Sequence, residues 1–259
     1  MINKKKIITN FLILLNKFEL FKKIFNIIRN LENVECITYK NLHFYFISRN
    51  WTTNYRYATF ASKEPDTINW IEEMSQDSIF WDVGANIGLY SIFAAKFSSS
   101  KVYAFEPSFL NLEILYKNIN LNGQKENITI VPISLNSNSQ EGYFELGSLN
   151  HGGALSNFVQ KNKLNVNCDS SYKTISISPS NFQNVFSLKK PDYIKIDVDG
   201  LEYEILKGIE IFLIHTKSVL IEINLKNLTD QENINNLLKK NNFYLSKKGI
   251  VPNQIWYKR

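Results

Sequence analysis

The sequence has few of the residues that stabilise small folds through covalent bridges or metal ions. Its 259 residues include two cysteines, Cys36 and Cys168, which lie far apart and lack the spacing of a metal site. This argues against a disulfide framework and favours a reducing compartment. The three histidines, His43, His151 and His215, are too scattered along the chain to suggest a site of histidine metal ligands.

Long apolar runs are also missing from the first 30 residues. The longest there, Phe11 to Leu15, is far too short to cross a bilayer. Apolar residues recur in this segment at helical steps of three and four, which predicts an amphipathic helix. We favour a helix that packs its apolar stripe on the main domain. The alternative is a basic helix that lies on an anionic membrane surface through residues 1–30.

Excess positive charge is absent from most of the chain, although the formal net charge is +6. Residues 1–30 hold seven Lys or Arg and one Glu, so the remainder carries 23 cations and 23 acids. A protein body that binds a nucleic-acid backbone should present a basic face, so a nucleic-acid partner is not favoured. We expect a cytoplasmic protein, either free or peripheral at the inner face of the membrane. The Lys- and Asn-rich composition suggests a bacterial source.

The rest of the chain has the pattern of an α/β fold. Residues 34–60 alternate in character and predict short strands or a hairpin. Strands and helices then alternate, and runs such as Tyr193–Ile196 and Val219–Ile223 are nearly continuous apolar stretches. Such strands are typical of a sheet that is covered on both faces. The pattern predicts a doubly wound, mostly parallel sheet.

We divide the chain into two parts on this basis. Residues 1–62 would hold the amphipathic helix and the short strands, and residues 63–259 would form the α/β domain. Within that domain, residues 134–178 are polar and rich in Asn and Ser. They predict a long insertion with weak strands, which would serve as a lid or a substrate wall.

A glycine loop follows the first predicted strand, in the stretch "FWDVGANIGLY". Gly84 and Gly88 allow a sharp turn and a close approach of a ligand to the backbone. Their spacing is not the G-x-G-x-x-G of a dinucleotide site, and an acid, Asp82, stands just before them. A carboxylate is unfavourable beside a pyrophosphate and favourable beside an ammonium or a sulfonium group. The loop therefore indicates S-adenosylmethionine rather than NAD.

A second acid supports a nucleoside ligand. Glu106 ends the next predicted strand, 22 residues after Gly84, and a carboxylate there can accept both hydroxyls of a ribose. On its own, the glycine loop could be no more than a tight turn between a strand and a helix. The agreement of the loop, Asp82 and Glu106 favours cofactor binding.

Three motifs in order resemble one family. The segments "FWDVGANIGLYS", "VYAFEPS" and "YIKIDVDGLEYEILKG" resemble the FkbM-type methyltransferases, a branch of the class I fold that uses S-adenosylmethionine. The resemblance covers about residues 63–224. It implies a Rossmann-like, seven-stranded sheet with an antiparallel last hairpin. It also implies methyl transfer to a hydroxyl oxygen, often of a sugar in a natural product or a surface glycan.

The resemblance also implies roles for individual residues. Around the methionine part of the cofactor it places Asp82, Gly84, Ala85, Asn86 and Gly88. Glu106 would take the ribose hydroxyls, and Ile133 and Ser134 would flank the adenine.

Candidates for the chemistry lie in "KIDVDGLE" and "IEIN". Methyl transfer to a sugar hydroxyl needs an aligned oxygen and removal of a proton. Asp197 is the first candidate for base or substrate anchor, and Glu202 is the second. Lys195 shares a strand face with Asp197, and its alternative role is a structural ion pair with Asp197 or Glu222. The alternative for Glu202 is a favourable charge at a helix start.

Clustered oxygen ligands also allow a hard divalent ion such as Mg²⁺. Asp197, Asp199, Glu222 and Asn224 are the candidate ligands, although a metal-free base and its orienting group would have the same pattern. His151, in the predicted lid, is either a base brought in on closure or an ordinary loop histidine.

The leading hypothesis is thus an S-adenosylmethionine-dependent O-methyltransferase that acts on a sugar, glycan or other small hydroxylated acceptor. Two alternatives remain open. One is an RNA methyltransferase, supported only by the high isoelectric point of about 9.1. The other is a degenerate fold that binds the cofactor or a partner without catalysis.

Overall fold

The computed structural model describes residue 23, residues 32–164 and residues 170–259. The chain forms two units, Met1–Val34 and Glu35–Arg259. The helix and the membrane contact predicted for residues 1–30 fall outside the described residues, apart from the helical Lys23. None of the described helices is long and apolar enough to cross a membrane.

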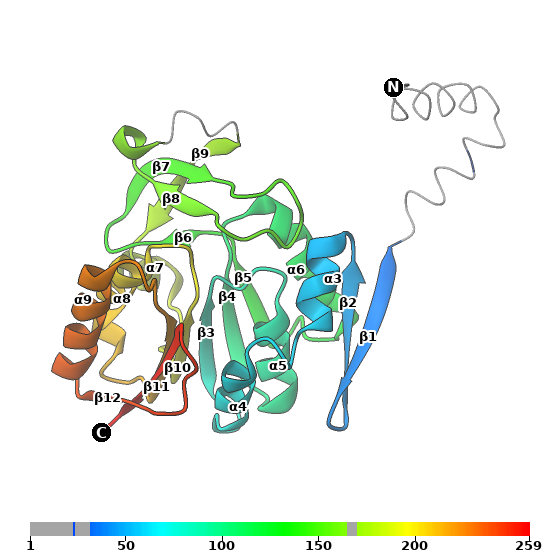
Figure 1. Cartoon of the computed structure of the whole chain (residues 1–259), viewed down its shortest axis with the longest axis horizontal. Coiled ribbons are helices and arrows are strands. Elements are labelled where there is room, and N and C mark those ends of the chain that lie inside the picture. Colours follow the sequence, from blue (N-terminus) through cyan, green and yellow to red (C-terminus); the bar gives the residue numbers. More distant parts are fainter. Residues whose placement is uncertain (1–22, 24–31, 165–169) are drawn as a thin grey trace. The chain divides into compact units, whose positions relative to one another are not determined.

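A seven-stranded sheet forms the centre of the second unit (Figure 1). Its order is β12-β13-β11-β10-β3-β4-β5, and the neighbours from β11 to β5 are parallel. Strand β13 is antiparallel to both β11 and β12. The strands are β3 (Ile79–Val83), β4 (Lys101–Phe105), β5 (Ile128–Val131), β10 (Tyr193–Ile196), β11 (Ser218–Glu222), β12 (Phe243–Leu245) and β13 (Asn253–Lys258). The predicted fold is confirmed, including the antiparallel last hairpin.

Helices cover both faces of this sheet, because successive residues of a strand point to opposite faces. In β3, Phe80 packs in a core cluster with residues of α4 (Pro65–Glu72), α5 (Leu89–Phe97) and α6 (Phe109–Leu121). The next residue, Trp81, packs in a second cluster with α7 (Pro179–Phe186), α8 (Glu202–Gly208) and α9 (Leu228–Lys240). Both aromatic side chains are almost fully buried, and each such burial stabilises the fold by about 1.5–3 kcal/mol.

The hairpin predicted before this domain is present as β1 (Asn33–Tyr39) and β2 (Leu42–Ser48). Phe44 and Phe46 of β2 belong to the same core cluster as α5 and α6. The pattern did not predict the helix that follows, α3 (Trp51–Ala58). Its signal is a capping box, in which Asn50 accepts from Thr53 N and the Thr53 hydroxyl accepts from Asn50 N. The boundary placed at residue 62 stays a prediction.

The insertion has a sheet of its own, with the order β6-β9-β7-β8. Its strands are β6 (Ser134–Leu135), β7 (Gln140–Glu145), β8 (Asn157–Val159) and β9 (Ser171–Ile177), and the turn η1 (Lys161–Lys163) follows β8. Figure 1 shows β7, β8 and β9 beyond the upper ends of the central strands. These are the carboxyl ends of β3, β4 and β10, where ligands bind in open α/β sheets.

Candidate functional site

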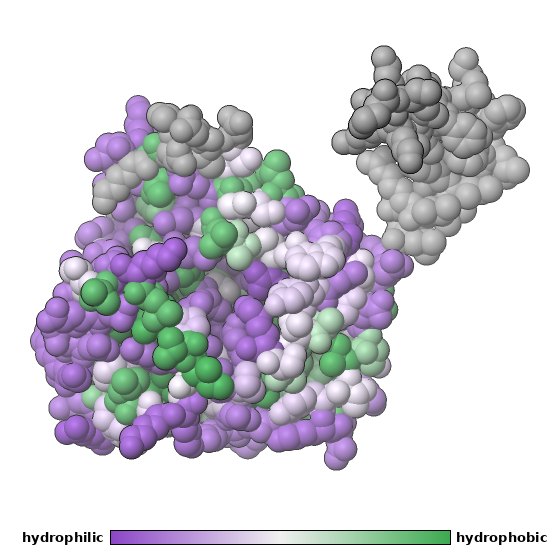
Figure 2. Space-filling model, in the orientation of Figure 1, coloured by the Kyte–Doolittle hydropathy of each residue, from purple (hydrophilic) through white to green (hydrophobic). Residues whose placement is uncertain are grey.

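A cavity of about 220 Å³ lies at this edge of the sheet. It is lined by residues that follow β3, β4 and β10, by α3 and by the insertion. The sheet order reverses direction at β3, because β4 lies on one side of it and β10 on the other. Figure 2 shows the same face of the molecule hollowed near its centre, below the insertion. This is the switch point at which the fold class binds its ligands.

The glycine loop between β3 and α5 forms one wall of the cavity. Gly84 and Gly88 both have a φ of +87°, which residues with a Cβ rarely adopt. A Cβ on Gly84 would lie 1.9 Å from the carbonyl oxygen of Asp197, and one on Gly88 would lie 2.6 Å from a methyl group of Leu115. The space that these glycines leave is therefore filled by the protein itself. Packing therefore requires glycine at both positions, and Gly84 also lines the cavity. The approach of a ligand to the backbone of this loop stays a prediction.

Two buried oxygens next to this loop lack hydrogen-bond partners. Asp82 Oδ2 accepts from the Ser91 hydroxyl at 2.5 Å, but Oδ1 has no partner, and neither has Asn86 Oδ1. Burial raises the pKa of Asp82, although Lys195 nearby acts in the opposite direction. Buried acceptors are rarely left unpaired in proteins. Asn86 lines the cavity, so its Oδ1 fits a ligand that brings an N–H donor. Asp82 is buried behind the lining, where its carboxylate favours positive charge nearby.

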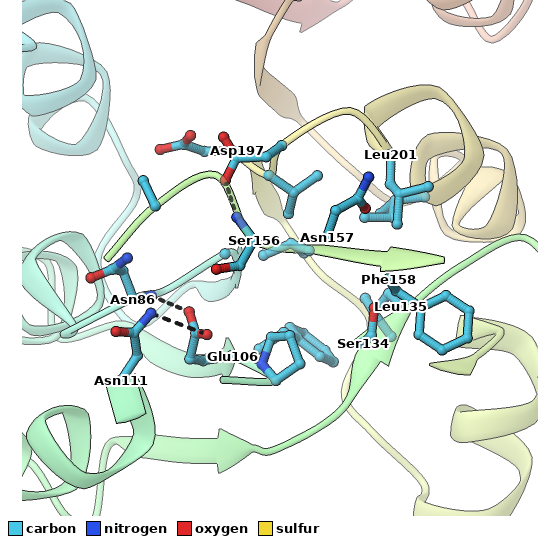
Figure 3. A pocket seen from close by; sticks show the side chains of 18 of the residues that line it. Asn86, Glu106, Asn111, Ser134, Leu135, Ser156, Asn157, Phe158, Asp197 and Leu201 are labelled. Atoms are coloured by element: carbon cyan, nitrogen blue, oxygen red, sulfur yellow. Dashed lines mark hydrogen bonds between the residues drawn. The ribbon is translucent and has the colours of Figure 1, made fainter. Parts of the chain in front are cut away.

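Glu106 follows β4 and contacts the loop at Asn86, and Figure 3 shows it beside Asn86 and Asn111. Its Oε2 accepts from Asn86 N at 2.7 Å, and its Oε1 accepts from Ser108 N at 2.9 Å and from Asn111 Nδ2 at 3.4 Å. Burial raises the pKa of Glu106 to about 7, although these hydrogen bonds favour the charged form. Each carboxylate oxygen has more than one lone pair, so Glu106 can still accept hydroxyl groups from a ligand in the cavity.

The cavity continues from Glu106 along an apolar surface. Ile133, Ser134, Leu135 and Phe158 line this part, and Ser134 is the first residue of β6. Flat apolar walls of this kind suit an aromatic ring. The placement of Ile133 and Ser134 beside an adenine stays a prediction, and nothing in the arrangement blocks it.

A second carboxylate, Asp197, lines the cavity on the β10 side. Lys195, which is 1% exposed, donates to Asp197 Oδ2 at 2.5 Å and lies 4.9 Å from the ring of Tyr90. Burial alone would raise the pKa of Asp197, but Lys195 and a hydrogen bond from Glu222 hold it well below its ordinary value. The same hydrogen bond raises the pKa of Glu222. The contact between the two carboxyl groups therefore favours the ionised form of Asp197 and the protonated form of Glu222. The ion pair considered for Lys195 and Asp197 is present.

The network extends to residues that the sequence pattern did not single out. The hydroxyl of Tyr90 donates to Glu64 Oε2 at 2.9 Å, and Lys63 pairs with Glu64 Oε1 at 2.9 Å. Arg56 of α3 and Lys63, which lies after this helix, also line the cavity. Tyr90 belongs to the glycine-loop motif and Lys63 precedes a helix start, but no spacing rule connects these residues across the fold.

The other candidates for chemistry have different surroundings. Glu202 is the first residue of α8, and its carboxylate accepts from Gly200 N at 3.0 Å. Burial raises the pKa of Glu202 to about 7, but Glu202 is not among the residues that line the cavity. The imidazole of His151 faces Glu113 Oε2 at 3.2 Å, and His151 does not line the cavity either.

The four predicted metal ligands do not come together as a set. Asp199 Oδ2 accepts from Ser156 N at 3.1 Å, and Asn224 Oδ1 accepts from Lys226 N at 3.0 Å. Across residues 32–164 and 170–259, no group of three or more His, Cys, Asp or Glu residues is arranged to hold a metal ion. The donor set does not fit Mg²⁺ in this arrangement, because the ammonium group of Lys195 already binds Asp197 Oδ2.

The fold and the site together define the class of protein: a Rossmann-like fold of the methyltransferase type, with a cavity at its switch point. Residues 82–245 match the sequence profile of the family described as the methyltransferase FkbM domain. The chain belongs to this family. The predicted resemblance is confirmed.

Individual relatives agree with this assignment. The hexuronic acid methyltransferase AglP of Haloferax volcanii is 29% identical over 163 residues, which are 62% of each chain. The methyltransferase sdnD of Sordaria araneosa is 27% identical over 166 residues, 54% of this chain and 63% of that protein. The chain thus spans less than two thirds of the length of these curated relatives. The crystal structure of methyltransferase FkbM from Methylobacillus flagellatus KT superposes with a TM-score of 0.52 at 16% identity, over 71% of this chain and 44% of that one.

Proposed function

We propose that this protein is an S-adenosylmethionine-dependent methyltransferase that transfers a methyl group to a hydroxyl oxygen of a sugar or another small acceptor. The observation that carries this proposal is the cavity beside the glycine loop, where Glu106 and the unpartnered Oδ1 of Asn86 lie together and Asp82 is buried behind the lining. Glu106 suits hydroxyl groups, and Asn86 Oδ1 beside the buried Asp82 suits a cationic nitrogen.

The residues present fit this cofactor, which would supply an activated methyl group on a sulfonium centre. Glu106 would accept the two ribose hydroxyls. Asp82 and Asn86 would accept from the ammonium group of the methionine part, together with the backbone of Gly84. The apolar wall at Ile133 and Ser134 would hold the adenine.

The Asp197 end of the cavity would hold the acceptor. A carboxylate with a lowered pKa is a poor proton acceptor in the ground state, but it binds and orients a hydroxyl group well. Glu222, whose pKa is raised by its hydrogen bond to Asp197, would in its protonated form keep a second negative charge away from this end. We therefore assign Asp197 as the anchor that accepts a hydrogen bond from the acceptor hydroxyl and aligns it. The oxygen becomes strongly acidic as it takes up the methyl group, and its proton would then pass to Asp197. Lys195 would keep Asp197 ionised, and Glu202 would stabilise the start of α8.

Two cationic side chains in the cavity indicate an acceptor that carries a negative charge. Arg56 and Lys63 line the cavity, and a guanidinium group matches a carboxylate with two parallel hydrogen bonds. The relative from Haloferax volcanii is named for hexuronic acid. We therefore propose that sugars with a carboxylate are preferred over neutral sugars of the same size.

Two measurements test the proposed function. Calorimetry with S-adenosylhomocysteine should show one site per chain, and its absence would overturn the cofactor assignment. Release of S-adenosylhomocysteine should then be measured with a panel of uronic acids and matched neutral hexosides. Turnover of the uronic acids supports the acceptor class, whereas equal turnover of both sets would contradict the role given to Arg56 and Lys63. Activity that is unchanged by EDTA is expected, because the donor set does not fit a metal.

A further inference from the structure

One segment of the insertion covers the cavity and is held by side chains of the main domain. We name residues 151–156 the strap; it belongs to the connection between β7 and β8. Gly153, Ala154 and Ser156 of the strap line the cavity. Its backbone is bound at His151 O by Asn50 Nδ2 (3.1 Å), at Gly152 O by Arg56 Nε (2.6 Å), at Gly153 O by Asn86 Nδ2 (2.8 Å) and at Ser156 N by Asp199 Oδ2 (3.1 Å).

Asn111 of α6 connects this strap to Glu106. It is 4% exposed, and its Oδ1 accepts from Gly152 N at 2.9 Å. Its Nδ2 lies 3.4 Å from Gly153 O and 3.4 Å from Glu106 Oε1. Both distances exceed the usual 2.7–3.2 Å of such bonds. The amide group of Asn111 is therefore shared between the strap and the carboxylate, and it is bound tightly by neither.

A second residue connects the same two groups in parallel. Asn86 donates its backbone N–H to Glu106 Oε2 and its side-chain amide to Gly153 O. Figure 3 shows Asn86 and Asn111 side by side, each with a hydrogen bond to Glu106. A ligand hydroxyl that competes with Asn111 for Glu106 Oε1, at the 3.4 Å contact, would therefore free a donor that also reaches Gly153 O.

The size of the cavity indicates that the strap must move outward before a cofactor can enter. Cavities that hold a cofactor or a drug-sized ligand usually measure about 300–1,000 Å³, and this one measures about 220 Å³. Because Gly153, Ala154 and Ser156 form part of its wall, movement of the strap would enlarge it directly.

We propose that Asn111 is a positioning residue that couples occupancy of Glu106 to closure of the strap. When ligand hydroxyls bind Glu106, the amide of Asn111 is released from Oε1 and shortens its hydrogen bond to Gly153 O. The strap then closes over the bound nucleoside and completes the wall around the acceptor at Ser156. Cofactor binding would in this way precede acceptor binding. This inference rests on the proposed function, because it takes the ribose of the cofactor as the group that binds Glu106.

Amide hydrogen exchange with S-adenosylhomocysteine as the probe tests the coupling without an acceptor. In the wild-type chain, the ligand should slow exchange of residues 148–156 by about tenfold or more, because it stabilises the closed strap. In Asn111→Ala the same ligand should slow exchange by less than about twofold. Its affinity should fall by about tenfold, as expected for one lost hydrogen-bonding group. The fold of the variant is checked by its thermal midpoint.

Two further variants separate coupling from general destabilisation. Asn111→Asp keeps an acceptor for Gly152 N but has no N–H to share, so it should also lose the ligand-dependent protection. Glu113→Gln is the matched control, because Glu113 lies on the same helix and contacts the strap through His151 but not Glu106. It should keep the wild-type protection.

The possible results are distinct. Protection in the wild type and in Glu113→Gln, together with its loss in both Asn111 variants, supports the proposal. If S-adenosylhomocysteine binds the wild type but leaves exchange of the strap unchanged, the coupling is wrong and the cofactor assignment stands. Equal protection in Asn111→Asp and the wild type would also overturn the coupling. If the wild type binds no S-adenosylhomocysteine, the proposed function itself fails.

Discussion

The two ends of the cavity hold carboxylates with different burial and opposite chemistry: Glu106 is 5% exposed, whereas the side chain of Asp197 is 29% exposed. Glu106 and Asp197 both follow central parallel strands, and both line the same cavity. Neutral N–H donors surround Glu106, whose pKa is raised to about 7, whereas Lys195 keeps the pKa of Asp197 below its ordinary value. Hydrogen bonds from neutral groups offset only part of the cost of burying a charge, whereas an ammonium group offsets more of it. A ligand can therefore change the protonation state of Glu106, whereas Asp197 stays charged.

The largest expected effect is at the charged end. Asp197→Asn keeps the shape of the side chain but removes its charge, so kcat should fall on the order of a thousandfold. The affinity for S-adenosylhomocysteine should change little, because Asp197 faces the acceptor. Initial rates and calorimetry measure the two quantities. Glu141→Gln, on the surface of the insertion, serves as the control, and a loss of cofactor affinity equal to the loss of rate would contradict this division of the cavity.

At the other end, Glu106→Gln should weaken S-adenosylhomocysteine binding by about a hundredfold, because two hydrogen bonds to a charged group are replaced by bonds to a neutral amide. The stability of the protein should fall modestly as well, because the amide nitrogen of Gln cannot accept from Asn86 N or Ser108 N. Calorimetry and thermal unfolding test both statements. Binding as tight as in the wild type would mean that no hydroxyl groups meet Glu106.

Because the pKa of Glu106 is raised, the binding of S-adenosylhomocysteine should depend on pH. The protonated form prevails below about pH 7, and ligand hydroxyls bind the ionised form better. Affinity for S-adenosylhomocysteine should therefore rise with pH through 7 and become level above it, a gain of about tenfold between pH 6 and 8. Glu106→Gln should remove this dependence. A slope that persists in the variant would assign the titration to another group, such as Glu202.

The smallest effect is expected at Glu202, which has a raised pKa but lies outside the cavity lining. Glu202→Gln should change kcat and cofactor affinity by less than about threefold, because an amide oxygen can still accept from Gly200 N at this helix start. Steady-state rates test this. A loss of two orders of magnitude would instead make Glu202 the general base, as the sequence pattern allowed.

The fold and the family could be read from the sequence because their signals are local. The apolar runs of β10 and β11, the glycines of the β3–α5 loop and the acid at the end of β4 each follow a period or a spacing rule. These rules correctly gave a doubly wound sheet. The close contact of Gly84 with the carbonyl of Asp197 follows no such rule, because Asp197 lies 113 residues further along the chain.

The contacts of the insertion could not be predicted in the same way. Gly153 is held by Asn86 and Asn111, which lie 67 and 42 residues earlier in the chain. Side-chain amides that bind the backbone of a loop have no period, and Asn is common throughout this sequence. The helix α3 was missed because its first residues continue an alternating segment, although the capping box at Asn50 marks its start.

The central claim is that the cavity holds a nucleoside cofactor at Glu106 and an acceptor at Asp197. A crystal of the protein grown or soaked with S-adenosylhomocysteine tests it most directly. We predict that both ribose hydroxyls donate to Glu106, that the amino group meets Asp82 and Asn86, and that the sulfur faces the space beside Asp197. A ligand bound elsewhere, or one whose ribose does not reach Glu106, would contradict the claim.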